Sequence, residues 1–265
     1  MNGPAGAADL YPRSVNPEEA IRAGFRCGAK GTHSSRTLMF PDLCAALAAT
    51  PANGSRADYA AAIIDANCLG KLTAATRRLT NQRLGELYAL DPEVPLFRVL
   101  RRLWEGDEAG RPLLALQCAL ARDPLLATTA APVIDLHPEG EFQRDAVRSA
   151  LRKAVGDRLN EATLEKVIRN AASSWSQSGH LEGRTFKRRR RVHATPFAVA
   201  YGLYLARLSG FRGAQIFASV WMAMLDCTPS HAREMALEAK RIGLIDLRAA
   251  GEVVDISFAR LERAG

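Results

Sequence analysis

The chain has 265 residues, of which 48% are hydrophobic and 24% are charged, and its formal net charge is +8. This composition is that of a folded chain and excludes general disorder, and the length allows one large domain or two to three modest ones. No apolar run approaches the roughly 18 to 20 residues that cross a bilayer, and the first residues lack the regions of a secretory signal. We therefore expect a cytoplasmic protein without a membrane partner.

Residues 1–16 form a leader that we expect to be disordered. From there to residue 138 the pattern predicts a bundle of short helices, separated by Pro, Gly and Asn residues and without strand signals. Ser55 and Thr73 are good N-caps, and proline at a first helical position marks several other starts. Two of the predicted helices have both ends assigned, at residues 35–49 and 124–136. For the others the sequence assigns the start, at Pro17, Ser55, Thr73, Pro95 and Pro112.

The charge excess lies in one stretch. Residues 143–195 hold 13 basic and 5 acidic residues, which gives +8, whereas the preceding 142 residues sum to −1. Helices are predicted over 142–155 and, after the cap Asn160, over 161–176, and a short basic ribbon follows. Two helices followed by a ribbon is the order of a winged helix-turn-helix. We therefore predict a basic winged-helix-like module over 141–195.

The remaining residues repeat this order and are nearly neutral, with 8 basic and 7 acidic groups. Helices are predicted from Pro196 to Gly210, over 214–225 and over 231–242. A hairpin follows, because residues 252–258 alternate in places and Gly251 supplies a turn. We predict a C-terminal winged-helix module over 196–262 with a small β-hairpin, so that the whole chain is mainly α-helical.

The basic ribbon predicts contacts to phosphates, since cations that neutralise phosphates release condensed counterions. Arginine suits this role because its planar fork binds phosphate in a bidentate manner. A solvated loop or a localisation-type signal is the alternative. The predicted phosphate ligands are Arg184, Lys187, Arg188, Arg189, Arg190 and Arg191.

The second half of the helix predicted over 161–176 is rich in small hydroxyl and amide groups. Such groups bond to phosphates and base edges when a helix enters the major groove. A capped helix end with its polar side in water is the alternative, and Trp175 is best explained as a core residue. The predicted groove contacts are Arg169, Asn170, Ser173, Ser174, Ser176 and Gln177.

The sequence contains no pattern typical of a metal site or a catalytic site. The five cysteines include no C-x-x-C pair, and the five histidines do not join them at metal spacing, so we expect no metal and no cofactor. The loop 31–36 combines serines with His33, but the sequence assigns it no acidic partner. The run 70–73 lacks the upstream glycine of a phosphate loop because Asp65 stands there. We expect a protein that is not an enzyme and has no catalytic residues.

One run is suggestive of a family. Residues 59–78, YAAAIIDANCLGKLTAATRR, resemble the I-x-x-x-N-x-L-x-K-x-[ST]-x-x-T-x-R run of BrxA-type proteins from bacteriophage-exclusion (BREX) defence clusters. The matching positions would be Asn67, Lys71, Thr76 and Arg77. That family has been likened to the helical RNA-binding factor NusB. The resemblance implies a small, non-enzymatic, nucleic-acid-binding component of an antiviral defence system.

These patterns together predict a helical bundle over 17–138 followed by two winged-helix-like modules. The expected function is DNA binding by an accessory or regulatory subunit of a prokaryotic multiprotein system, with duplex DNA and other subunits as partners. A scaffold that contacts protein through the neutral C-terminal module, or a protein that binds structured RNA, remains an alternative.

Overall fold

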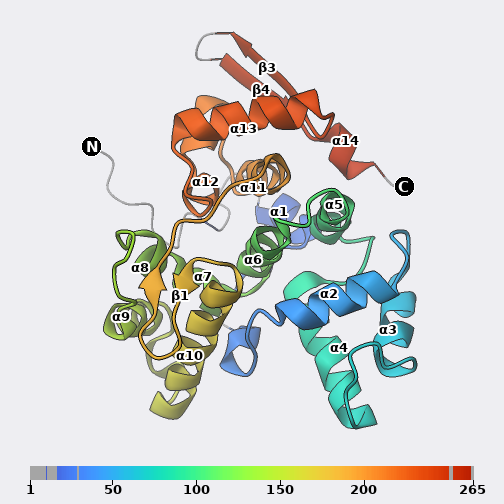
Figure 1. Ribbon diagram of the computed structural model, residues 1–265, viewed down its shortest axis with the longest axis vertical. Helices are drawn as coiled ribbons and strands as arrows, with labels where there is room; N and C mark the ends of the chain where they lie inside the picture. Colours follow the sequence, from blue (N-terminus) through green and yellow to red (C-terminus); the bar gives the residue numbers. More distant parts are fainter. Residues whose placement is uncertain (1–9, 11–16, 29, 251–252, 264–265) are drawn as a thin grey trace.

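Helices dominate the computed structural model, which describes residues 10, 17–28, 30–250 and 253–263 (Figure 1). Within this part of the chain the only sheets are two antiparallel hairpins of two strands each. The prediction of a mainly α-helical chain with a C-terminal hairpin is therefore confirmed. The leader, except Leu10, and the turn at Gly251 lie outside the described residues.

The first helices follow the predicted punctuation. Ser55 forms a reciprocal capping box with Asp58, and the Thr73 side chain accepts from the Thr76 N–H. The elements in this part are α1 (Pro17–Ala23), the 3-10 turn η2 (Thr32–Ser34), α2 (Phe40–Ala49), α3 (Arg56–Ile64), α4 (Ala74–Tyr88), α5 (Pro95–Trp104) and α6 (Arg111–Arg122).

Two predicted helix boundaries are wrong in this region. The helix expected from residue 35 begins only at Phe40, because the segment before it packs on another helix: the Leu38 N–H donates to Ser174 Oγ over 2.8 Å. The helix expected over 124–136 is divided at Thr129 into α7 (Pro124–Thr128) and α8 (Ala130–Ile134). Pro132 follows the break and has no N–H to continue the helical ladder.

Residues 139–195 follow the predicted element order of two helices and a short hairpin. Helices α9 (Arg144–Val155) and α10 (Glu161–Gln177), joined by the 3-10 turn η3 (Gly156–Arg158), precede the hairpin of β1 (Leu181–Glu182) and β2 (Arg188–Arg189). Glu141, which comes before α9, bridges to Arg188, so β2 lies between Glu141 and β1. Helices α7 and α8, which precede this part in the chain, pack on α9.

The C-terminal part has the same order. Its elements are α11 (Pro196–Leu208), the 3-10 turn η4 (Gly213–Ala218), α12 (Val220–Ala223), α13 (Pro229–Arg241), β3 (Asp246–Ala250), β4 (Val253–Ser257) and α14 (Ala259–Glu262). The helix predicted over 214–225 is instead the pair η4 and α12, separated at Ser219, which is in an extended conformation. The hairpin of β3 and β4 forms in the expected place, with Leu247 opposite Ile256.

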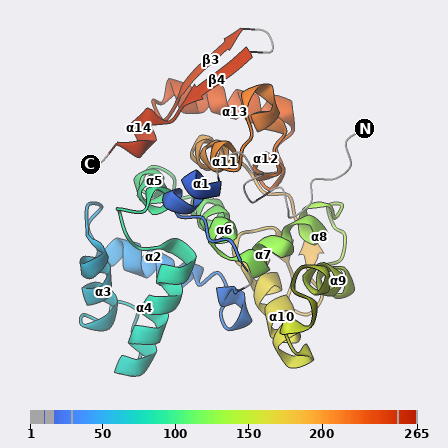
Figure 2. The same ribbon diagram turned by 180° about the vertical axis from the view of Figure 1, so that it is seen from behind.

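One continuous core runs through all these parts. Helix α11 is buried at nearly every position and packs on α5, α6 and α13. Figure 2 shows α1 beside α5 and α11, while α13 and its hairpin cover one end of the molecule. Tertiary packing therefore crosses residue 195. The predicted domain boundary at that residue remains a prediction. None of the described helices has the length and apolar character needed to cross a membrane.

Candidate nucleic-acid interface

The first wing, residues 181–191, begins with a tight hairpin over 181–189 that is held against α10. Gly183 has φ +111, and a Cβ there would lie 2.1 Å from the Phe186 carbonyl oxygen, so only glycine fits the turn. Lys187 Nζ donates to Ser176 Oγ of α10 over 2.7 Å and to the Gly183 carbonyl over 3.1 Å. The loop between the strands is therefore fixed in place beside the end of α10.

The arginines of this wing divide between two roles, because successive side chains of a strand point to opposite faces. Arg189 is buried, and its guanidinium donates to the Val133 carbonyl and forms an ion pair of 2.6 Å with Asp226. Asp226 also accepts from the Val192 N–H. Arg189 therefore joins the wing to α8 and the C-terminal part, and the prediction that it binds phosphate is not supported by its position.

The other predicted phosphate ligands are reachable from solvent. Arg190 is exposed but paired with Glu139 and Glu182. Arg184, Arg188 and Arg191 are exposed, and no carboxylate among the described residues pairs with them.

The arginines of α9 are neutralised by α10. Arg144 pairs with Glu165 at 2.6 Å, Arg148 pairs with both Glu161 and Glu165, and Arg152 reaches Glu161 at 2.6 Å. Burial would raise the pKa of Glu165, but the two arginines lower it below its ordinary value. The unpaired positive charge of residues 143–195 therefore lies mainly on the first wing and the open side of α10, with the exposed Lys153 of α9 and Arg158 of η3 in addition.

Three of the predicted groove contacts bond to other parts of the protein, and of these only Ser174 is fully buried. Asn170 Nδ2 donates to the His33 carbonyl at 2.8 Å, Gln177 Oε1 accepts from the Phe40 N–H at 3.1 Å, and Ser174 is fully buried. These side chains hold the segment 32–40 against α10. Ser174 is closed to nucleic acid in this structure, so its assignment to base contacts needs correction. Asn170 and Gln177 are half-buried with polar groups engaged within the fold, and their assignment remains a prediction.

Ser174 belongs to a buried chain of hydrogen bonds with His33 and Asp123. His33 Nε2 lies 2.8 Å from Ser174 Oγ, and His33 Nδ1 lies 2.8 Å from Asp123 Oδ2. Burial would raise the pKa of Asp123, but the charge and hydrogen bonds of His33 lower it below its ordinary value. The order of groups is that of a catalytic triad. All three are 0% exposed, so in this structure they form a tie between η2, α7 and α10.

The open side of α10 carries the remaining candidates. Lys166, Arg169, Ser173 and Ser176 follow at intervals of three and four residues and therefore share one helix face. Lys166 and Arg169 are exposed without a carboxylate partner among the described residues, and Ser176 accepts from Lys187. We call these four residues of α10 the basic ridge. Lys166 was missed from the sequence, although its spacing of three from Arg169 could have revealed it.

The expected core role of Trp175 is confirmed, since it is 0% exposed and its indole N–H donates to Thr129 Oγ1 at 2.8 Å.

His180 lies beside Trp175 at the base of the first wing, hydrogen-bonded to Ser178 Oγ and the Met224 carbonyl. Burial lowers the pKa of His180 from 6.5 to about 4. The ring is therefore neutral near pH 7 and bonds the wing to the C-terminal part.

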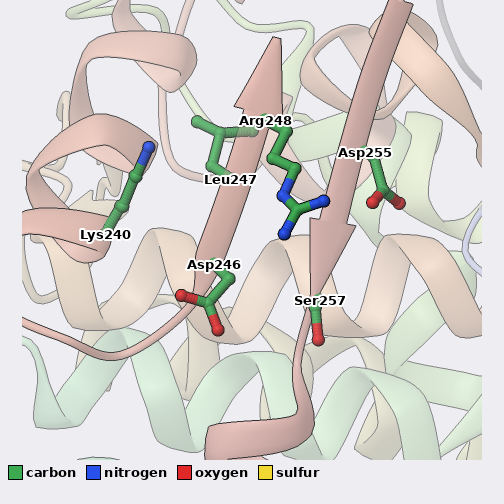
Figure 3. A pocket seen from close by; sticks show the side chains of 6 residues that line it. All are labelled: Lys240, Asp246, Leu247, Arg248, Asp255 and Ser257. Atoms are coloured by element: carbon green, nitrogen blue, oxygen red, sulfur yellow. The ribbon is translucent and has the colours of Figure 1, made fainter.

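The C-terminal hairpin presents charges of both signs. Figure 3 shows a surface pocket in which Lys240 and Arg248 lie among Asp246 and Asp255. Arg248 is directly opposite Asp255 in the strand register, and opposite charges in that position attract. We call residues 246–250 and 253–257 the second wing; among these described residues the one cation, Arg248, lies opposite a carboxylate, in contrast to the cations of the first wing.

The positions that match the BrxA-type run organise the turn between α3 and α4. Asn67 Oδ1 accepts from the Lys71 N–H, and Arg77 donates to the Ile64 carbonyl. Lys71 Nζ pairs with Asp42 at 2.7 Å, and Thr76 is exposed near the start of α4. Lys71 and Thr76 line an open groove that also includes Arg36 and Gln177, beside the end of α10.

Among the described residues no three His, Cys, Asp or Glu side chains gather in a way that could hold a metal ion. A scan against models of protein families finds no match for this chain, and a search of curated protein sequences finds none either.

Proposed function

We propose that the chain is a non-enzymatic protein that binds duplex DNA through the basic ridge and the first wing. The observation that carries this proposal is a set of exposed cations that no described carboxylate neutralises, on two elements joined by the contact of Lys187 with Ser176. These free cations are Lys166, Arg169, Arg184, Arg188 and Arg191.

The contrast with the rest of the region supports a polyanion ligand. The α9 arginines and Arg190 are paired with carboxylates, and Arg189 is buried. An exposed cation without a pair adds to the local positive potential and attracts phosphates from a distance. A helix beside a wing also suits the duplex, since the helix can enter the major groove while the wing follows the backbone.

The resemblance of residues 59–78 to BrxA-type proteins extends this proposal to a biological setting. On that basis the chain acts in the cytoplasm as an accessory or regulatory subunit of a prokaryotic multiprotein system for defence against phage, with other subunits as partners. The mixed charges of the second wing support a surface that contacts protein rather than DNA.

Salt dependence tests DNA binding directly. If the free cations and their neighbours neutralise about four to six phosphates, log K plotted against log salt concentration should have a slope of about −4 to −5. Arg188→Ala should weaken binding to all sequences alike and reduce the steepness of this slope by about 1. Both are measured by fluorescence anisotropy of a labelled duplex titrated at several salt concentrations.

Lys240→Ala is the matched control, because Lys240 is an exposed cation of the neutral C-terminal part. It should leave the affinity and the slope nearly unchanged. A flat salt response of the wild-type protein, or an equal effect of both substitutions, would contradict the proposal. Stronger competition by duplex RNA than by duplex DNA would replace DNA by structured RNA as the ligand.

A second candidate function is a scaffold that docks protein through the C-terminal part. The observation in its favour is exposed apolar surface: Leu237 of α13 is 51% exposed, Ile242 is 39% exposed and Val253 of β4 is 72% exposed. Apolar side chains at a protein–protein contact are typically covered by the partner. This function is compatible with DNA binding by the first wing, since the two surfaces are on different elements.

A further inference from the structure

The tip of the first wing carries an aromatic ring that the fold does not use. Phe186 is 70% exposed, whereas each of the other eight phenylalanines is either buried or packed against the core. An exposed ring of this size loses the stabilisation that burial would give it. Phe186 contributes no packing that could explain its presence at the tip.

The loop holds this ring in a defined position. Gly183 closes the turn against the Phe186 carbonyl, and Lys187 fastens the loop to Gly183 and to Ser176 of α10. A ring on a fixed hairpin loses little conformational freedom when it binds, so it is suited to insertion into a partner.

Basic residues lie on both sides of Phe186 in the sequence of the loop. Arg184 and Lys187 flank Phe186 in the loop, and Arg188 follows at the start of β2. If these cations bind phosphates, Phe186 lies over the groove between two phosphate rows. The apolar surface available in that groove is the stack of bases. Apolar side chains in this setting wedge between base steps of the minor groove and partially unstack them.

We propose that Phe186 is a wedge that stacks against bases in the minor groove, next to the major-groove segment faced by the basic ridge. This inference rests on the proposed DNA binding. It assigns to the first wing a contact that depends on base stacking and not on charge.

Substitution of the ring separates the two contributions. Phe186→Ala should weaken binding of the full chain to a mixed-sequence duplex by roughly tenfold, as expected for the loss of one stacked base, without changing the salt slope. Val253→Ala is the matched control, because Val253 is a comparably exposed apolar residue of the second wing. It should leave the affinity unchanged.

Phe186→Trp gives a direct readout. The three native tryptophans are buried, so an added indole at the wing tip is the one that bases can quench by stacking. We expect duplex DNA to quench the emission of Phe186→Trp much more than that of the wild-type protein, while the affinity is retained.

The outcomes distinguish this inference from the proposed function. If the wild-type protein does not bind DNA at low salt, the proposed function fails and the wedge fails with it. If DNA binds with the expected salt slope but Phe186→Ala has wild-type affinity and Phe186→Trp is not quenched, the wedge alone is overturned. A response of Phe186→Trp to anionic phosphatidylserine vesicles in the absence of a response to DNA would overturn it in favour of a membrane surface.

Discussion

Arg188 and Arg189 are neighbours in the sequence with different environments. Arg188 is exposed, and Arg189 is 2% exposed with its guanidinium engaged by Asp226 and the Val133 carbonyl. A run of basic residues gives no sign of this difference. The alternation of a strand could have suggested it, but the register depends on Glu141 and on Asp226, which are distant in sequence.

Arg189→Ala should therefore destabilise the protein. The substitution leaves Asp226 without its cation and opens a void at the base of the first wing, and removal of one partner of a buried pair costs about 3 kcal/mol. Arg188→Ala should change the free energy of unfolding by less than about 0.5 kcal/mol. Urea denaturation of both variants measures these values, and equal destabilisation by the two would contradict the assignment.

Helix α10 shows, at the scale of an element, what could be predicted and what could not. Its extent, its Asn160 cap and the core position of Trp175 follow from local signals. The use of its polar residues does not, because Asn170, Ser174 and Gln177 bond to the segment 32–40, more than 130 residues earlier. A polar face looks the same in sequence whether water, DNA or another segment covers it.

The same limit applies to the helices whose boundaries were misplaced. The segment 35–39 has helical propensity, but its backbone donates to α10, and the region 214–225 breaks at Ser219 where local periodicity continues. In the segment 35–39 a tertiary contact decides the conformation and overrides propensity. The order of helices and hairpins in the last 120 residues was nevertheless predictable, since caps and turn residues mark it.

The first wing is bonded to the C-terminal part by a histidine that must stay neutral. His180 has a folded-state pKa of about 4, lowered by burial, whereas an unfolded histidine titrates near 6.5. Between these values the unfolded state binds more protons, so stability rises with pH there. The contribution of neutral His180 to the free energy of unfolding is complete above pH 6.5. It falls by up to about 3 kcal/mol as the pH falls toward 4.

Denaturation of the wild-type protein at several pH values checks this expectation. His180→Gln should be less stable at pH 7 but should lose less stability between pH 6.5 and 4, since it has no proton to gain. His193→Gln is the control, because His193 is exposed and should keep the wild-type pH dependence. A wild-type dependence that His180→Gln leaves unchanged would rule out His180 as its source.

Across the whole molecule the two parts that were predicted as winged-helix-like modules share their core with the N-terminal helices. Gln117 of α6 donates to the Ala198 carbonyl of α11, and Tyr201 of α11 donates to the Leu96 carbonyl of α5. The Trp175 indole of α10 donates a hydrogen bond to Thr129 Oγ1, between α7 and α8. The order of modules in the sequence suggests separate units, but their helices complete one another's packing.

We expect the chain to unfold as one cooperative unit. A fragment beginning at Pro196 would expose the faces of α11 that α5 and α6 cover, and burial of such apolar surface is the main source of stability. The full chain should show one calorimetric transition whose calorimetric and van't Hoff enthalpies agree, and the loss of near-UV and far-UV circular dichroism should coincide. Two resolved transitions, or a fragment 196–265 with native near-UV signal, would instead establish the C-terminal part as an independent domain.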